Sequence, residues 1–326
     1  MTVAALWRFP VKSMGGHQVP QMRLDARGGH ADRLWAVRDL EKDMTASARR
    51  IPALLGCTAR YAAEPGPDAG PGAAPEVLIT LPGGDEVSSG DPAVHVRLSE
   101  LAGRDVRLTA LPPLEDTSLH RLSVRQSKAT FAVDEVRRDF GLAADEALPD
   151  TSVFTTRQIR TLARFSTPPG TFVDLSPIHL MSTTSLASLS PDGAGYDVRR
   201  FRPNVVVSVA DPGADFPEAD WVGAAVDIGT ARLQVSVPTV RCVVPTRPQP
   251  GLELDRAITR RLVDRTDRFL GVYADVTGAG LVRVGDTVAV RRPAAPGAVR
   301  ATAVSAGKTV VRQFQWVMEK TLLRER

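Results

Sequence analysis

The chain has 326 residues, 43% of them hydrophobic and 24% charged, which is the composition of an ordinary globular protein with room for two domains. Arginine supplies most of the positive charge behind the net +4, because the only lysines are Lys12, Lys42, Lys128, Lys308 and Lys320. Aromatic residues make up 5% and do not interleave with any basic run, so the charge does not indicate a nucleic-acid-binding surface.

The two cysteines, Cys57 and Cys242, are too few for a disulfide framework, a four-cysteine zinc site or a cysteine-ligated iron–sulfur cluster. The N-terminus lacks the apolar core of a signal peptide, and no apolar run is long enough to span a membrane. We therefore expect a cytoplasmic protein with no transmembrane segment and no iron–sulfur cluster in this chain.

The first third of the chain predicts short strands separated by Gly, Pro and Asp turns, which is typical of a barrel or sandwich. Strands are expected at residues 3–10, 18–24, 31–37, 77–81 and 94–98. Lys12 and Ser13 follow the first strand in a loop where Gly15 and Gly16 permit a tight turn and expose backbone N–H groups. These elements form a predicted first domain over residues 1–115.

Residues 116–150 are polar and poorly periodic, and they predict a linker with a short helix at 134–142. A second domain is expected over 151–295. Its predicted elements are a strand at 171–175, a strand passing into a helix over 178–189, a buried strand at 205–209, a helix at 252–269, and a hairpin formed by 273–276 and 280–290. The predicted fold class is mainly β with some α, with short helices at the edges.

The tail over 296–326 carries apolar residues at helical spacing, namely Val310, Val311, Phe314, Val317, Met318 and Leu322. This pattern predicts an amphipathic C-terminal helix packed on the protein, with a dimer or membrane-surface contact as the alternative.

Cys242 lies where a β-rich run over 232–237 passes into a loop with Pro245, Pro248 and Pro250. Prolines stiffen the loop, so the thiol is held beside Arg241 at a strand-to-loop junction. Such a thiol is a candidate metal ligand or nucleophile, whereas an isolated cysteine is more often a small buried hydrophobic residue. Cys57, in an apolar context, has the pattern of a core residue.

Three N-terminal residues are candidate phosphate ligands. Lys12 and Ser13 combine an ammonium group, a hydroxyl group and backbone donors, although a solvated lysine in a turn gives the same pattern. Arg33 falls inside a predicted strand, where a guanidinium needs either a buried ion pair or a bound anion.

The second half of the chain adds further candidates. Thr184 and Ser185 lie at a predicted helix N-terminus, which either binds a phosphate or is simply capped by these hydroxyls. Arg202 and Asn204 flank Pro203 and could present a guanidinium and an amide to a phosphate or a heterocycle. His179 is a pocket candidate, with a structural histidine as the alternative.

Taken in chain order, eight short motifs resemble the MOSC family, the molybdenum-cofactor sulfurase C-terminal domain proteins that carry their own N-terminal β-barrel domain. The resemblance covers roughly residues 1–290. Members of this family include the amidoxime-reducing components and their bacterial relatives. The motifs are FPVKSMGG at 9–16, DRLW at 32–35, MTA at 44–46, STTSL at 182–186, FRPN at 201–204, WVG at 221–223, RC at 241–242 and GD at 285–286.

The resemblance implies a MOSC N-terminal β-barrel-like domain followed by a MOSC β-barrel domain, with a molybdenum–molybdopterin cofactor between them. Cys242 would be the catalytic thiolate ligand of the metal, with Arg241 beside it as a cofactor-binding residue. The remaining implied cofactor contacts are Lys12, Ser13 and Arg33 on the phosphate, and Thr184, Ser185, Arg202 and Asn204 on the pterin side.

The resemblance also implies a reductase that removes oxygen from N-hydroxylated or N-oxygenated small molecules in a two-electron reaction. Electrons would come from a separate donor protein of ferredoxin or flavoprotein type. Residues 243–248 read VVPTRP, whereas reductase-like members tend to have a segment similar to TTVDP after Arg-Cys. The pocket mouth beside Cys242 is therefore expected to differ from theirs.

Two other functions are compatible with the same residues. In one, the protein is a non-catalytic carrier of the molybdenum cofactor or of sulfur, and Cys242 bears a persulfide or anchors the cofactor. In the other, a metal-free protein binds an anionic small molecule.

Overall fold

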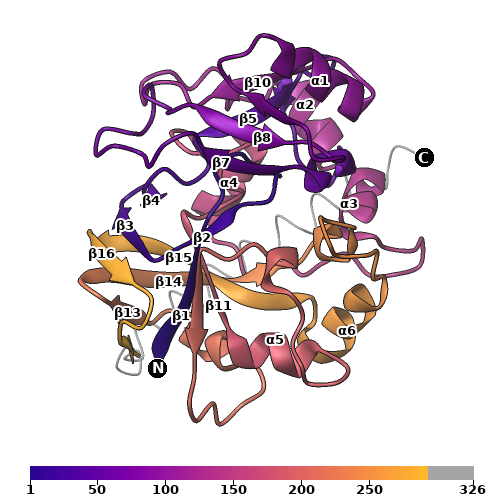
Figure 1. The fold of residues 1–326 in the computed structure, drawn as a ribbon. Helices are drawn as coiled ribbons and strands as arrows, with labels where there is room; N and C mark the ends of the chain where they lie inside the picture. The colour runs from indigo at the N-terminus through magenta and orange to yellow at the C-terminus, as the bar shows by residue number, and fades with distance from the viewer. Residues whose placement is uncertain (293–326) are drawn as a thin grey trace.

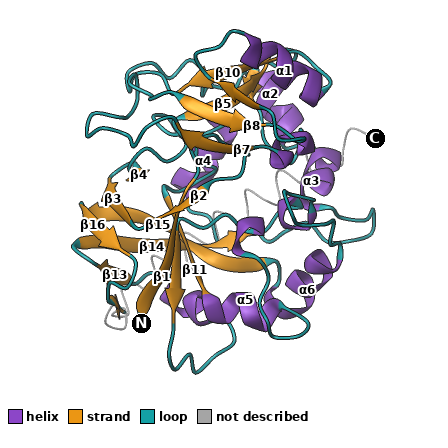
Figure 2. Cartoon of the chain, viewed as in Figure 1, coloured by secondary structure: helices purple, strands orange, loops and turns teal. Residues whose placement is uncertain are grey.

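The computed structural model describes residues 1–292 and shows two β-rich units, drawn one above the other in Figure 1. The predicted mainly-β fold class is confirmed, with helices lying around the strands (Figure 2). The predicted helix at 296–326 lies outside the described residues. Within residues 1–292, no helix is both long and apolar enough to cross a membrane.

One large sheet forms the lower unit and draws strands from both ends of the chain. Its order is β17-β13-β14-β15-β11-β12-β1-β2. The bounds are β1 (Thr2–Arg8), β2 (His17–Val19), β11 (Ile178–Ser182), β12 (Val205–Ser208), β13 (Ala225–Ile228), β14 (Ala231–Val240), β15 (Phe269–Gly278) and β17 (Val288–Arg291). The first strand pairs antiparallel with β12, from Thr2 opposite Ser208 to Leu6 opposite Val205.

A small sheet also pairs strands from the two ends of the chain. It contains β3 (Gln21–Asp25), β4 (Gly28–Gly29) and β16 (Gly280–Arg283), in the order β16-β3-β4. Val3, Leu6, Met22 and Leu24 consequently share one buried core with Val205 and other residues of the C-terminal half. The domain limits at 115 and 151 stay predictions, and the sheets do not follow them.

The upper unit contains two three-stranded sheets packed around a second core. The first sheet comprises β5 (Trp35–Asp39), β6 (Met44–Thr45) and β10 (Val106–Ala110), and the second comprises β7 (Thr58–Tyr61), β8 (Val77–Thr80) and β9 (Glu86–Ser88). The single-turn helix η1 (Pro52–Gly56) and α1 (Ala93–Ala102) complete the unit.

The strand expected at 94–98 is wrong, because these residues form part of α1. Val94 and Leu98 are buried four residues apart, whereas Val96 is 60% exposed, which is helical and not alternating burial. The backbone N–H of Ala93 is capped by Asp91 Oδ1 at 2.9 Å, and Gly103 ends the helix at φ +64°.

Two further strand assignments are also wrong. Residues 171–175 form no strand, and the expected hairpin does not exist because β16 pairs with β3 and β17 pairs with β13. These pairings join residues far apart in the sequence, and local alternation carries no information about them.

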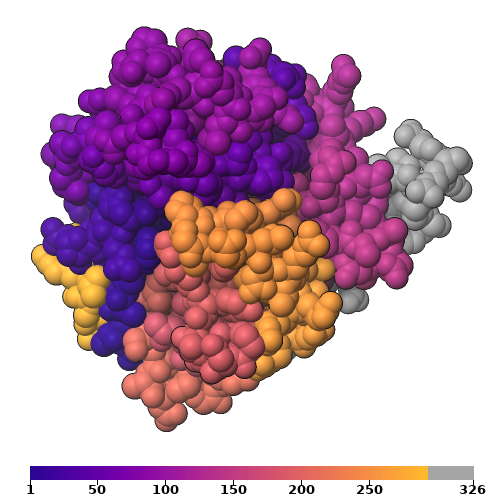
Figure 3. All heavy atoms as spheres, turned by 45° about the vertical axis from the view of Figure 1, so that its right-hand side comes forward, coloured from indigo at the N-terminus to yellow at the C-terminus, as the bar shows by residue number. Residues whose placement is uncertain are grey.

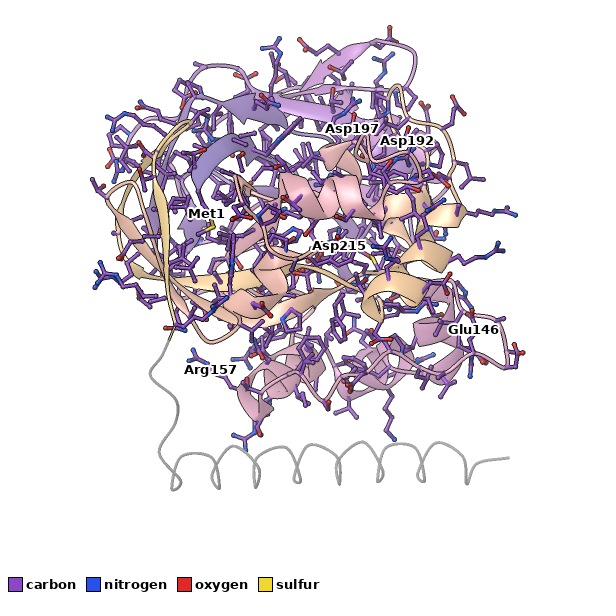
Figure 4. The ribbon with its side chains drawn as sticks, turned by 90° about the horizontal axis from the view of Figure 1, so that it is seen from below. Met1, Glu146, Arg157, Asp192, Asp197 and Asp215 are labelled. Carbon is purple, nitrogen blue, oxygen red and sulfur yellow. The ribbon has the colours of Figure 1, made fainter. Side chains whose placement is uncertain are left out.

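The segment expected to be a linker contains α2 (Val124–Thr130) and α3 (Val133–Phe140), followed by α4 (Thr156–Arg164). The helix expected at 134–142 is confirmed as α3. Figure 3 shows this segment in magenta on the flank where the upper and lower units meet. In the view from below, Glu146 and Arg157 lie along one side of the molecule, and Asp192 and Asp197 lie across α5 from them (Figure 4).

The lower unit carries the remaining helical elements. They are α5 (Thr183–Leu189), α6 (Ala257–Thr266), η2 (Val198–Arg200), η3 (Pro217–Trp221) and η4 (Val244–Thr246). The α5 and α6 helices pack together over a small apolar cluster that includes Met181, Leu186 and Leu262.

Candidate functional site

The loop after β1 places Lys12 between the two units. Its backbone N–H donates to Trp35 O at 2.8 Å, and Gly15 N donates to Cys57 O at 2.8 Å, which ties the loop to the upper unit. The Lys12 side chain is buried and forms an ion pair with Asp174. Burial lowers the pKa of Lys12 despite that ion pair, and the charges of Arg33 and Arg49 lower it further.

Ser13 lies in the same loop at φ +72° and is buried. Its Oγ accepts the backbone N–H of Ala48 at 2.9 Å, which leaves its O–H free to donate. Ser13 therefore fixes the loop, and no residue within 1–292 is shown accepting from its hydroxyl; a contact with a ligand stays a prediction.

Arg33 and Arg202 lie over the same aromatic ring. The guanidinium carbon is 4.8 Å from the Phe9 ring centre for Arg33 and 4.4 Å for Arg202. Arg33 is not in a strand as expected, but in the turn before β5, at φ +54°. It forms an ion pair with Asp32, whose carboxylate also accepts Asn204 Nδ2 at 3.0 Å.

Arg202 has two donors without a partner. Its Nη1 and Nη2 atoms are buried and form no hydrogen bond with the described residues. Burial and the neighbouring charge of Arg33 lower the pKa of Arg202 to about 9. Buried polar groups are nearly always satisfied, so two unpaired N–H groups on one guanidinium indicate a place for an anionic ligand.

Arg241 and Cys242 follow β14 directly, at the predicted strand-to-loop junction. Arg241 donates from Nη2 to Phe201 O at 2.8 Å, and its buried Nε has no partner among the described residues. Cys242 is half-buried, whereas Cys57 is fully buried and has its pKa raised by burial to about 12. Only Cys242 therefore combines access with nearby cations.

The structure adds residues that the sequence analysis did not assign to the site. Arg49 lies within electrostatic range of the Cys242 thiol and of Asp174, and Arg241 lies within range of Cys242, Asp174 and Tyr273. No local sequence pattern distinguishes Arg49 or Asp174, and residues 171–175 were assigned to a strand. We call Lys12, Arg33, Arg49, Arg202 and Arg241 the basic cluster.

Thr184 and Ser185 have no described hydrogen bond to the basic cluster. Ser182 caps α5, and the Ser185 hydroxyl donates to Glu218 Oε2 at 2.6 Å. Glu218 is buried and also accepts from Ser182 Oγ at 2.7 Å. In this structure Ser185 therefore serves the packing of η3, and a pterin contact from Thr184 or Ser185 stays a prediction.

The site contains no protein-only metal cage. Among residues 1–292, no group of three or more His, Cys, Asp and Glu side chains could hold a metal ion. Cys242 can supply one soft thiolate ligand, so a metal here would need its other ligands from a bound organic group. The basic cluster suits the anionic part of such a group.

Family models of the MOSC N-terminal beta barrel domain and the MOSC domain match residues 1–99 and 168–289. The chain belongs to the MOSC family. In this MOSC protein, Lys12, Arg33 and Arg49 come from the first matched segment, and Arg202, Arg241 and Cys242 come from the second. The site therefore needs both segments.

Two curated relatives are similar over most of their length. Mitochondrial amidoxime-reducing component 1 of Mus musculus is 26% identical over 313 residues, which cover 88% of this chain and 81% of the relative. Mitochondrial amidoxime reducing component 2 of Rattus norvegicus is 26% identical over 306 residues, covering 88% and 82%.

Solved structures with some similarity include the YUAD protein of Bacillus subtilis, at 11% identity and a TM-score of 0.39, covering 90% of this chain and 96% of that one. YiiM of Geobacillus stearothermophilus is 18% identical with a TM-score of 0.26, covering 36% and 55%.

Proposed function

We propose that this protein is a molybdenum-cofactor-dependent oxidoreductase that reduces N-hydroxylated or N-oxygenated small molecules. The observation that carries the proposal is the pair of Arg202 donors that find no partner within residues 1–292, inside a basic cluster next to half-buried Cys242. The relatives named as amidoxime-reducing components support the reaction class.

The residues present fit such a cofactor. Lys12 and Arg33 would hold its phosphate, and the unpartnered Nη atoms lead us to add Arg202, which the resemblance placed on the pterin side. The charge of Arg33 lowers the pKa values of both Lys12 and Arg202, and a bound anion would relieve that repulsion. Asn204 is fully buried beside Asp32 and keeps the Arg202 loop in place. Cys242 would be the protein ligand of the metal.

The bound cofactor would supply the two-electron chemistry, and the chain would supply position and protons. Reduction of an N–OH group consumes two electrons and two protons and releases water. Burial and the charge of Asp174 raise the pKa of Tyr273, so its phenol stays protonated and can donate a hydrogen bond at the site. Electrons would come from a separate donor protein of ferredoxin or flavoprotein type.

Metal analysis of the protein made in a molybdate-fed host tests the metal ligand. We expect about one molybdenum per chain and turnover of an amidoxime or hydroxylamine with an artificial electron donor. Cys242→Ala should lose activity and most of the metal but keep some pterin, measured as fluorescence after oxidation. Cys57→Ala is the matched control, because its buried thiol lies in the upper core, and it should keep metal and activity.

Equal metal and activity in wild type and Cys242→Ala would show that Cys242 is not the ligand. Metal and pterin without turnover would instead favour the cofactor or sulfur carrier. If the wild-type protein contains no metal, the result would favour the third function, a metal-free protein that binds an anionic small molecule.

Pterin occupancy tests the phosphate contacts separately. Lys12→Ala and Arg202→Ala should each reduce oxidised-pterin fluorescence severalfold, because each removes a buried charged donor. Lys128→Ala removes an exposed lysine from α2 and should leave occupancy unchanged. Unchanged occupancy in the first two variants would rule out this phosphate site.

A further inference from the structure

His179 is buried at the centre of the site but belongs to none of the ligand groups described above. It is the second residue of β11 and is 5% exposed. Its backbone forms two hydrogen bonds with Asn204, from Asn204 N to His179 O at 2.9 Å and from His179 N to Asn204 Oδ1 at 3.3 Å. The strand thus fixes the imidazole beside the Arg202 loop.

The imidazole contacts Arg241 through its Nε2 atom. Arg241 Nη1 lies 3.4 Å from His179 Nε2, and because a guanidinium has no acceptor, this contact is a hydrogen bond in the tautomer whose Nε2 carries no proton. The proton of a neutral ring is then on Nδ1. Burial, followed by the charge of Arg241, lowers the pKa of His179 well below its ordinary value and outweighs the opposing bonds to the backbone of Arg202 and Leu270, so the ring is neutral and one of its nitrogens is an acceptor.

The surrounding structure leaves the ring little freedom. Gly271 adopts φ +77°, and a Cβ at this position would lie 2.5 Å from His179 Nε2. Tyr273 stacks at a tilt with a 5.5 Å separation of ring centres. Only glycine permits the close approach of β15, so the imidazole is held in place from two sides.

Arg241 is therefore fixed by two acceptors. Phe201 O accepts from Arg241 Nη2, and His179 Nε2 accepts from Arg241 Nη1. The buried Nε of Arg241 has no partner among the described residues. A guanidinium is planar, so holding both Nη atoms sets the direction of the Nε–H.

We propose that His179 is a positioning residue that orients Arg241 so that its free N–H donates to the anionic part of the bound cofactor. This inference rests on the proposed function. It assigns His179 no contact with the reacting atoms.

The test uses cofactor-free full-length protein and inorganic pyrophosphate as the anion, with affinity measured by calorimetry at one salt concentration. The Arg241–His179 contact is at the long end of the hydrogen-bond range, so His179→Leu should weaken binding by about five- to tenfold. His179→Gln should stay within about twofold of wild type, because its carboxamide oxygen can reach the position of Nε2.

A double-mutant cycle distinguishes positioning from a general packing effect. In an Arg241→Ala background, His179→Leu should cause no further loss of pyrophosphate affinity. His120→Gln is the matched control, since it removes another buried histidine that bonds Thr167 instead of the basic cluster, and it should bind as wild type does.

Full affinity in His179→Leu, or an equal loss in the presence and absence of Arg241, would overturn the inference. If His179→Leu does not fold, His179→Asn replaces it, because the shorter amide does not reach Arg241; equal binding by the Asn and Gln variants then overturns it. If the wild-type protein binds no pyrophosphate, the anion site of the proposed function is ruled out together with this inference.

Discussion

Arg8, Arg200 and Arg202 have buried guanidinium nitrogens but differ in the acceptors that their Nη atoms find among the described residues. Arg8 forms a paired contact with Glu64, with N–O distances of 3.0 and 3.2 Å. Arg200 donates to the carbonyls of Pro245 at 3.1 Å and Glu253 at 2.8 Å. Arg202 has neither a carboxylate nor a carbonyl at its Nη atoms within the described chain. Arg8 and Arg200 are buried, and so are the Nη atoms of Arg202, so the missing acceptor and not burial carries the functional argument.

His120 makes folding stability depend on pH. It is fully buried, with Nδ1 2.8 Å from Thr167 Oγ1 and its ring 5.5 Å from that of Phe172. Burial lowers its pKa to about 4. Between that value and the ordinary pKa of about 6.5, the unfolded chain binds a proton that the folded chain does not. Stability should therefore fall as the pH drops through this window.

Urea unfolding of wild type and His120→Gln at several pH values between 7 and 4 measures this contribution. The variant should be less stable at pH 7, and the gap between the two proteins should narrow as the pH falls. Carboxylates also titrate here, but they cancel in the difference. A gap that stays constant over the whole window would show that His120 is not the proton acceptor.

At the scale of elements, the C-terminal end of α3 contacts residues of the site, although the sequence predicted α3 only as a helix within a linker. Asp139 O accepts Val243 N at 3.0 Å, one residue beyond Cys242, and Phe140 O accepts Arg268 Nη1 at 3.1 Å. The Asp139 carboxylate also pairs with Arg49 at 3.2 Å and with Arg50 at 3.7 Å. One helix end thus holds both the thiol loop and a cation of the basic cluster.

Asp139→Ala should destabilise the protein by about 1–3 kcal/mol, because it leaves two arginines without their carboxylate. The cost stays below that of a fully buried pair, since the Arg49 side chain is 34% exposed. Hydrogen exchange over 241–247 should become faster at the same time. Urea unfolding and exchange mass spectrometry check the two effects.

Glu135→Gln is the control on the same helix. Its partner Arg138 is 64% exposed, so the substitution should cost less than about 0.5 kcal/mol and leave exchange over 241–247 unchanged. Similar behaviour of the two variants would mean that the Asp139 carboxylate and its arginine partners do not steady the Cys242 loop.

The elements that the sequence predicted well are those whose burial shows in a local pattern. The continuous apolar run at 205–209 becomes β12, buried on both faces, and the strand that ends before Cys242 is found as β14. Val94, Val96 and Leu98 fit both a strand and a helix, and the buried pair four residues apart decides for α1. Arg33 was assigned to a strand because its neighbours are apolar, yet it lies in a turn, where its backbone N–H donates to Phe9 O at 2.7 Å and its side chain pairs with the adjacent Asp32.

For the site, the sequence could supply residue types but not their partners. Arg202, Arg241 and Cys242 lie in short recognisable motifs, so they could be named. Arg49, Asp174 and Asp139 are single charged residues whose role depends on contacts between distant segments. Thr184 and Ser185 were named as possible caps of a helix, but the cap is Ser182, and only the structure shows that the Ser185 hydroxyl donates to Glu218.

At the scale of the whole molecule, residues 2–19 run through both units. β1 and β2 belong to the large sheet of the lower unit, whereas the loop between them bonds Trp35 and Cys57 of the upper unit. Gly15 O also accepts Ala59 N at 2.9 Å. Unfolding of either core would therefore displace a segment that also packs in the other unit. We expect the described units to unfold in one cooperative transition.

Two leucines of equal burial test this cooperativity. Leu6 lies on β1 in the lower core, Leu98 lies on α1 in the upper core, and both are fully buried. Replacing either with alanine should cost about 2–5 kcal/mol through lost burial and a residual cavity. If the units unfold together, each substitution lowers the protection of the slowest-exchanging amides in β8 and in β11 by the same free energy, measured by native-state hydrogen exchange. If Leu98→Ala lowers protection in β8 alone, the units unfold separately, and residues 2–19 do not transmit stability between them.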